Sequence, residues 1–243
     1  MQAHLVAAGK YHDIDFARLE LLKLLADQPV IRTSVASGYA ETARLDQCEV
    51  LITYTCDLVP VGDELAALQR FLDRGGRWIA LHGTNSIIRF AADGKATTPD
   101  DAPDFMAMLG TRFLGHPPIA PFPVRIVRHD HALTEGLRDF SIEDELYLSQ
   151  RTAEIEVLMA SEFDGECPDF ADSKRRQEEV PILYQRQVGP GAILYCTLGH
   201  CRGHYDLQPL AGFWPHPQRC AWNYPIFTEI LRRAIAWAMH RPA

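Results

Sequence analysis

The 243-residue sequence lacks any basic stripe or patch. Its 24 lysines and arginines are outnumbered by 32 aspartates and glutamates, which gives a formal net charge of -8. Nucleic acids and anionic membranes attract proteins through positive surface charge, so neither is expected as a partner. Small molecules and other proteins remain as expected partners.

Long apolar runs and paired-cysteine motifs are missing as well. No segment reaches the roughly 20 apolar residues of a membrane helix, and the opening MQAHLVAAGK lacks the basic start, apolar stretch and cleavage site of a signal peptide. The six cysteines show no CxxC spacing and are too sparse for a disulfide scaffold, so we expect reduced thiols. These absences predict a soluble cytoplasmic protein.

The sequence also has no linker-like stretch and no internal repeat. A hydrophobic content of 47% is enough for a substantial core at this length. We therefore expect one domain over residues 1–243.

Strand-like and helical patterns alternate over the first third of the chain. They predict strands at residues 4–9, 30–35, 50–56 and 77–81 and helices at residues 16–26 and 63–74, with residues 34–46 as a loop. Asp15 is expected to cap the first helix, and Leu19, Leu22 and Leu25 to face the core. This order predicts a doubly wound parallel sheet with right-handed crossovers.

The remainder of the chain predicts further strands and two helices. Strands are expected at residues 123–128 and 155–163, a hairpin at residues 181–186 and 192–197, and helices at residues 104–110 and 225–239. Residues 87–103 form a loop suited to a lid. The charged segment 164–179 is expected to be a solvated loop. The hairpin would add antiparallel strands to the edge of the sheet.

The stretch GGRWIALHGTNS, residues 75–86, contains the first candidate functional residues. An apolar run between glycines is typical of a central parallel strand, and ligands bind just outside the carboxyl ends of such strands. His82 follows this run directly, Gly83 permits a tight turn, and Asn85 could line a pocket. The alternative, a hydrogen-bonded structural histidine, has equal weight from this stretch alone.

Other polar groups also follow apolar runs. They are His116 in GHPP, Asp144, Glu145 and Tyr147 in DELY, and His200 in LGH, with Arg202 close behind. Each has a structural alternative, because His116 could brace a proline turn and the two acidic residues could be solvated or start a helix. Their shared position at expected strand ends favours a common site.

The order of these motifs resembles the ThuA family, the trehalose-utilisation proteins of the class I glutamine-amidotransferase-like superfamily. The resemblance covers residues 50–204 and rests on GGRWIALHG, GHPP, HALTEGLRDF leading into DELY, and GPGAILYCTLGH. Two features depart from it: Ala132 stands where the family usually has proline, and residues 164–179 have no match.

The resemblance has consequences for chemistry. Glutamine amidotransferases carry a nucleophilic cysteine at the turn after the central strand, whereas His82 matches that position here, so thioester chemistry is excluded. His200 matches the histidine near the C-terminus of that superfamily. A site built around these two residues with His116, Glu145 and Tyr147 suits proton transfer or metal binding.

The family association with trehalose, related disaccharides and 3-keto-sugars suggests a reaction. A ketone at C3 acidifies the C2 proton, so a base can remove it while the glycosidic oxygen leaves. The expected catalytic residues are His82, Glu145 and His200, and the expected substrate-binding residues are His116, Tyr147, Asn85, Asp144 and Arg202. No cofactor is assigned. A divalent metal such as zinc, held by His82, His116, His200 and Glu145, is an alternative.

The sequence thus predicts a flavodoxin-like α/β domain with a mainly parallel sheet and added antiparallel edge strands. The expected function is a carbohydrate-metabolism enzyme that acts on a small-molecule carbohydrate without a cysteine nucleophile. A non-catalytic sugar-binding or assembly module of the same superfamily is the alternative. A hydrolase with Cys56 as nucleophile ranks last. A homo-oligomer is left open.

Overall fold

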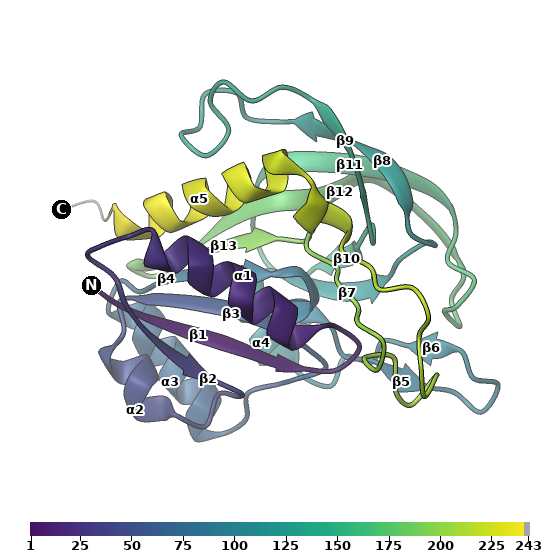
Figure 1. Ribbon diagram of the computed structural model, residues 1–243, viewed down its shortest axis with the longest axis horizontal. Coiled ribbons are helices and arrows are strands. Elements are labelled where there is room, and N and C mark those ends of the chain that lie inside the picture. Colours follow the sequence, from purple (N-terminus) through teal and green to yellow (C-terminus); the bar gives the residue numbers. More distant parts are fainter. Residues whose placement is uncertain (241–243) are drawn as a thin grey trace.

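The computed structural model describes residues 1–240, and a nine-stranded sheet runs through it (Figure 1). From β2 to β13 neighbouring strands pair in parallel, and from β13 to β9 they pair antiparallel. The spatial order is β2 (Arg32–Ala36), β1 (Gln2–Gly9), β3 (Val50–Cys56), β4 (Arg77–Leu81), β13 (Gly191–Cys196), β12 (Lys174–Val188), β11 (Glu156–Glu166), β8 (Ala120–Ile126) and β9 (Phe140–Asp144). The expected α/β fold with antiparallel strands added at one edge is confirmed.

Helices cover both faces of the parallel half, as Figure 1 shows. Every residue of β3 and β4 is buried, because strands covered on both faces need apolar side chains on both. One face packs against α1 (Ile14–Ala26) and α5 (Pro225–Met239), and the other against α2 (Thr42–Gln47), α3 (Asp63–Asp73) and α4 (Pro103–Leu109). Each face therefore has its own apolar core.

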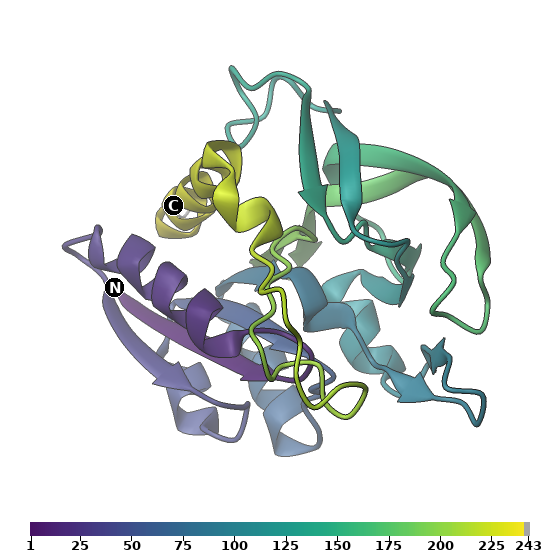
Figure 2. The ribbon, with the colours of Figure 1, turned by 45° about the vertical axis from the view of Figure 1, so that its right-hand side comes forward.

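The antiparallel half curves away from this sandwich, and the long β11–β12 hairpin extends beyond it (Figure 2). Short elements lie near the carboxyl ends of the parallel strands. They are the β7 (Thr111–Gly115) and β10 (Leu148–Arg151) pair, the β5 (Arg89–Phe90) and β6 (Ala96–Thr97) pair, and the 3₁₀ turns η1 (His82–Asn85) and η2 (Cys220–Asn223). Within residues 1–240, no helix is long and apolar enough to cross a membrane.

Two details of the first helix correct the sequence prediction. Asp13, not Asp15, caps α1, and its carboxylate accepts a hydrogen bond from the Phe16 amide at 3.1 Å. Leu19 is 53% exposed, whereas Leu21 and Leu25 are buried. The helix starts two residues earlier than expected, and its core face follows a four-residue spacing rather than the three-residue spacing of the leucines.

Three expected loops contain regular structure. The segment 34–46 includes most of α2, and the segment 87–103 includes β5 and β6. The segment 164–179 is mostly strand, because the β11–β12 ladder continues through it. Opposite charges face each other across that ladder, with Asp164 opposite Arg176 and Glu166 opposite Lys174. Such pairs stabilise an exposed hairpin, so a charged sequence forms strands here.

Candidate active site

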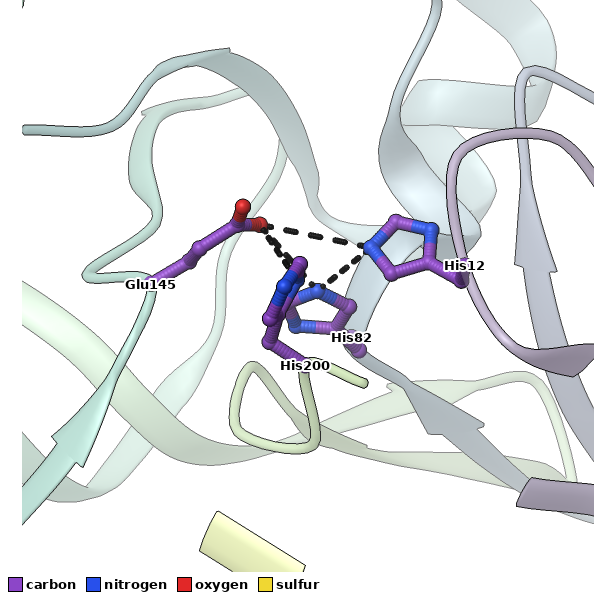
Figure 3. Close-up of side chains that lie close together, drawn as sticks. All are labelled: His12, His82, Glu145 and His200. Atoms are coloured by element: carbon purple, nitrogen blue, oxygen red, sulfur yellow. Dashed lines mark hydrogen bonds and ion pairs between the residues drawn. The ribbon is translucent and has the colours of Figure 1, made fainter. Parts of the chain in front are cut away.

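Four buried side chains from distant parts of the chain converge at the carboxyl ends of the parallel strands (Figure 3). His12 follows β1, His82 follows β4 and His200 follows β13. Glu145 arrives from the antiparallel half, directly after β9. This is the edge where α/β sheets bind ligands, so the topology itself collects these groups.

The ligand atoms of these four residues lie within 4.8 Å of one another. Nε2 of His82 is 2.9 Å from Nε2 of His12. Oε2 of Glu145 is 3.1 Å from Nδ1 of His200, 3.4 Å from Nε2 of His82 and 4.0 Å from Nε2 of His12. We refer to His12, His82, Glu145 and His200 as the histidine–glutamate cluster.

Hydrogen bonds to the outer nitrogens fix the three imidazole rings. Nδ1 of His12 lies 3.1 Å from the Lys10 carbonyl oxygen, and Nδ1 of His82 lies 2.8 Å from the Thr197 carbonyl oxygen. Nε2 of His200 lies 2.8 Å from Oε1 of Gln218. The inner nitrogens therefore face the centre of the cluster.

The backbone around His82 is held in an unusual conformation. His82 has φ of 44°, a left-handed region that non-glycine residues rarely adopt. The Tyr195 hydroxyl fixes this turn by donating to the His82 carbonyl oxygen at 2.6 Å and accepting from the Asn85 amide at 2.8 Å. A Cβ atom at Gly83 would lie 2.8 Å from the Thr55 carbonyl oxygen, so this residue must be glycine. Such strain is typical of functional sites.

Asp144 and Asn85 occupy supporting positions behind the cluster. The Asp144 carboxylate accepts hydrogen bonds from the backbone amides of Glu145, Gly199 and His200, at 2.7, 2.8 and 3.1 Å. It therefore ties the Glu145 and His200 segments together. The Asn85 side chain donates to the Thr111 hydroxyl at 2.8 Å and anchors the η1 turn to β7.

A cavity of about 720 Å³ opens beside the cluster. His12 and Glu145 form its buried end, together with His116, Tyr147 and Arg202. Nε2 of His116 is 3.5 Å and a guanidinium nitrogen of Arg202 is 3.8 Å from Oε1 of Glu145, the oxygen that faces away from the other imidazoles. Aromatic side chains line the rest of the cavity: Tyr11, Phe90, Phe113, Phe170 and Trp214.

The electrostatics of the cluster keep Glu145 ionised and His12 neutral. Burial alone would raise the Glu145 pKa, but His116 and His200 outweigh it and hold this pKa well below its usual range. Burial, followed by the neighbouring His82 and His200, holds the His12 pKa well below its usual value. Burial raises the Cys56 pKa, so this thiol is protonated and poorly suited to act as a nucleophile.

The structure brings most of the sequence-predicted candidates together. His82, His116, Glu145, Tyr147, His200 and Arg202 all surround the cluster or the cavity end. His12 was missed. Its signal was the same as that of His82, a histidine just past a predicted strand, but two residues, Lys10 and Tyr11, separate it from that strand. The four-residue group that could hold a metal contains His12, while His116 lies on the cavity side of Glu145.

Comparison with known families agrees with the motifs and the fold. The family model described as ThuA, trehalose utilisation, matches residues 6–212. The chain belongs to the ThuA family. No curated protein sequence matches this ThuA-family chain.

Solved structures share its fold at low sequence identity. A protein described as ThuA-like from Parabacteroides merdae ATCC 43184 is 13% identical, with a TM-score of 0.70 over 98% of this chain and 89% of its own. Another from Bacteroides uniformis ATCC 8492 is 16% identical, with a TM-score of 0.65 over 98% and 91%. A β-galactosidase from Bacillus circulans sp. alkalophilus is 14% identical with a TM-score of 0.54, covering 98% of this chain but 30% of the enzyme. These likenesses concern the fold alone.

Proposed function

We propose that this ThuA-family protein is an enzyme of carbohydrate metabolism that acts on a disaccharide or 3-keto-sugar in the cavity. The observation that carries the proposal is Glu145, whose carboxylate is buried among imidazoles at the cavity end. Burying an ionised carboxylate is costly, and a buried carboxylate with a shifted pKa at the end of a cavity is typical of a functional site. Its pKa remains well below the usual range, so it is available as an anion.

The cavity has the size and lining that a sugar requires. A volume of about 720 Å³ falls within the range of small-molecule sites, roughly 300–1,000 Å³. Tyr11, Phe90 and Trp214 present flat apolar surfaces on which a pyranose ring can stack. Asp93 and Asp169 line the same cavity and can accept hydrogen bonds from sugar hydroxyls. This combination of stacking surfaces and acceptors is consistent with a small carbohydrate.

The site residues fit an elimination on a 3-keto-sugar. A base removes the C2 proton, its electron pair forms an enediolate with the C3 ketone, and collapse expels the C1 glycosidic oxygen, which takes up a proton. His116 is the group placed to move these protons, since its side chain is 21% exposed and Glu145 orients it. Arg202 lines the cavity beside Glu145, so its guanidinium can hold the enediolate oxygen.

His82 and His200 take a different part in this proposal. Both are fully buried and neither lines the cavity, but both contact Glu145, which does. They therefore position the carboxylate that orients His116. The Tyr147 ring stacks on His116 and packs on His82, so it holds these two imidazoles in place. The cytoplasmic location expected from the sequence stays a prediction, and a homo-oligomer stays open.

The experiment is a turnover assay on a panel of disaccharides and their 3-keto forms. We expect the full-length protein to consume at least one keto-disaccharide with release of a monosaccharide. Glu145→Gln should lower kcat/KM by about 100-fold or more, the usual size of a lost acid–base contribution, because His116 loses the carboxylate that orients it for proton transfer. Glu143→Gln is the matched control, because Glu143 is exposed two residues earlier on the same segment.

The alternative of a sugar-binding module predicts a different result. Such a module would bind a sugar of the panel while leaving it unchanged, and Glu145→Gln would change affinity without any turnover to lose. Binding without conversion of any panel member would therefore contradict the proposed enzyme.

A further inference from the structure

The geometry points to a metal centre in which His12, His82, His200 and Glu145 hold one divalent transition-metal ion, with zinc as the ion that fits best. The inference goes beyond the proposed carbohydrate function, since it does not depend on which substrate the cavity takes. It rests on where the protons of the three imidazoles must be.

The first two imidazoles are assigned by backbone carbonyls. A carbonyl oxygen can only accept a hydrogen bond, so Nδ1 of His12 must donate to Lys10 and Nδ1 of His82 must donate to Thr197. In a neutral ring the other nitrogen then carries a lone pair. The two Nε2 atoms, 2.9 Å apart, therefore face each other as acceptors.

The third imidazole is assigned by a guanidinium group. Arg202 can only donate, and its Nη1 lies 3.1 Å from Oε1 of Gln218, which identifies that atom as the amide oxygen. Nε2 of His200, 2.8 Å from the same oxygen, must therefore donate to it. In a neutral ring its Nδ1 then carries a lone pair, and this buried atom has no hydrogen-bond partner within residues 1–240.

Four acceptors thus point at one another in a buried space (Figure 3). Nδ1 of His200 lies 3.1 Å from Oε2 of Glu145. With a neutral ring this contact sets a lone pair against a carboxylate, so only a proton or a metal ion between the two atoms makes it attractive. A cation bound between the four atoms attracts the lone pair of each one and offsets the repulsion between them. The outer hydrogen bonds on the three rings are also those that orient imidazole ligands in metal sites.

The donor set and its spacing select the ion. Three imidazole nitrogens and one carboxylate oxygen form a normal ligand set for zinc, whereas Mg²⁺ and Ca²⁺ prefer oxygen ligands. Tetrahedral zinc with bonds of about 2.0–2.1 Å needs ligand atoms about 3.3–3.5 Å apart. Four of the six pairs of ligand atoms lie 2.9, 3.1, 3.4 and 4.0 Å apart, which brackets this value, and all pairs lie within 4.8 Å.

His116 is outside this ligand set. Its Nε2 faces Oε1 of Glu145 at 3.5 Å, on the opposite side of the carboxylate from the cluster, and its Nδ1 is bonded to the Pro117 carbonyl oxygen at 2.8 Å. His12 and His116 are therefore a matched pair of histidines. Both contact Glu145, but only the first should be needed for the metal.

The test is metal analysis of the untagged full-length protein from cells grown with added zinc. We expect about one equivalent of zinc per chain. After removal with a chelator, Co²⁺ should bind with the visible absorption bands of a four-coordinate site. His12→Gln and Glu145→Gln should weaken zinc binding by at least about 100-fold, because losses in the outer hydrogen bonds alone cost about 10- to 100-fold. His116→Ala should keep its zinc.

Two results would overturn the inference. One is a wild-type protein that is isolated without metal and, after chelator treatment, binds neither zinc nor Co²⁺ at one equivalent. The other is zinc that His12→Gln and Glu145→Gln, shown by circular dichroism to be folded, both retain as wild type does. If the variants do not fold, the Co²⁺ spectrum of the wild type decides the question by itself.

These outcomes are separate from those of the sugar assay. A metal-free protein that converts a keto-disaccharide would refute the metal centre and leave the proposed function. A protein with stoichiometric zinc that converts no member of the panel would support the metal centre and contradict the proposed function.

Discussion

His82 and Gly83 form the turn that carries one imidazole of the cluster out of β4. His82 adopts a left-handed backbone conformation, and Gly83 packs against β3 so closely that a Cβ would meet the Thr55 carbonyl oxygen and the Cys56 Cβ at 2.8 Å. The strain at His82 is therefore stabilised by a close backbone contact that only glycine permits.

A substitution at this turn tests the packing. Gly83→Ala should lower the free energy of unfolding by about 1–3 kcal/mol, the usual cost of forcing an extra methyl group into a packed site. Gly38→Ala is the control, because a Cβ there would meet nothing within 4 Å, and it should leave the free energy of unfolding nearly unchanged. Equilibrium urea unfolding measures both. Equal stability of the two variants would contradict this description of the turn.

The residues of the cluster differ in how far a sequence can reveal them. His82 and His200 follow clear apolar strands within one to four residues, so their placement at the sheet edge could be inferred. His12 lies three residues past β1 on a turn held by segments distant in sequence, because the Lys10 amide donates to the Cys56 carbonyl oxygen and the Asp13 amide donates to the Cys201 carbonyl oxygen. These bonds depend on the tertiary path of the chain, which local patterns do not contain.

The first helix illustrates what determines the buried face of an element. Ala17, Leu21 and Leu25 are buried on α1, whereas Leu19 is 53% exposed. The sequence offers leucines on more than one face, so hydrophobicity alone does not identify the face that packs on the sheet. The four-residue spacing of the buried set decides it.

Paired substitutions on α1 check that face. Leu21→Ala should destabilise the protein by about 2–5 kcal/mol, since it leaves a cavity under the helix. Leu19→Ala should change stability by less than about 0.5 kcal/mol, as exposed substitutions usually do. Thermal or urea unfolding compares the two variants directly. A larger loss of stability for Leu19→Ala than for Leu21→Ala would contradict the assignment of the buried face of α1.

The β11–β12 hairpin shows why charged segments resist prediction. Residues 164–179 look like a solvated loop because their composition is polar, yet their charges pair across two strands, as Asp164 does with Arg176. The cross-strand partner of Asp164 is therefore distant in sequence. Parallel strands such as β3 were predictable because burial on both faces leaves a continuous apolar run.

The whole molecule joins a parallel α/β sandwich to an antiparallel extension, and the cluster forms where they meet. The sandwich supplies His12, His82 and His200, and the extension supplies Glu145. The alternation of strands and helices predicts the first part from sequence. It does not predict how the second part folds back, which is why the distances between these groups required the structure.

The pH dependence of stability follows from this buried site in the metal-free protein. The His12 pKa lies well below its unfolded value of about 6.5, so below pH 6.5 the unfolded chain binds a proton that the folded chain does not. Stability present above pH 6.5 is thus lost as pH falls, by up to about 1.4 kcal/mol per pH unit for this group. Glu145, with its pKa lowered, adds a loss of the same sign below about pH 4.5.

Urea unfolding at several pH values measures that slope. Chelator-treated wild type should lose stability between pH 7.5 and 5 more steeply than His12→Gln, which has no group to titrate at this position. Parallel slopes for the two proteins would contradict a buried, neutral His12.

Anomalous X-ray diffraction on either side of the zinc absorption edge tests the central claim most directly, because it locates the ion itself. Crystals of the untagged protein should show one anomalous peak about 2.0–2.2 Å from the inner nitrogens of His12, His82 and His200 and from a Glu145 oxygen. The absence of a peak at the histidine–glutamate cluster, with zinc at surface histidines or nowhere, would contradict the account.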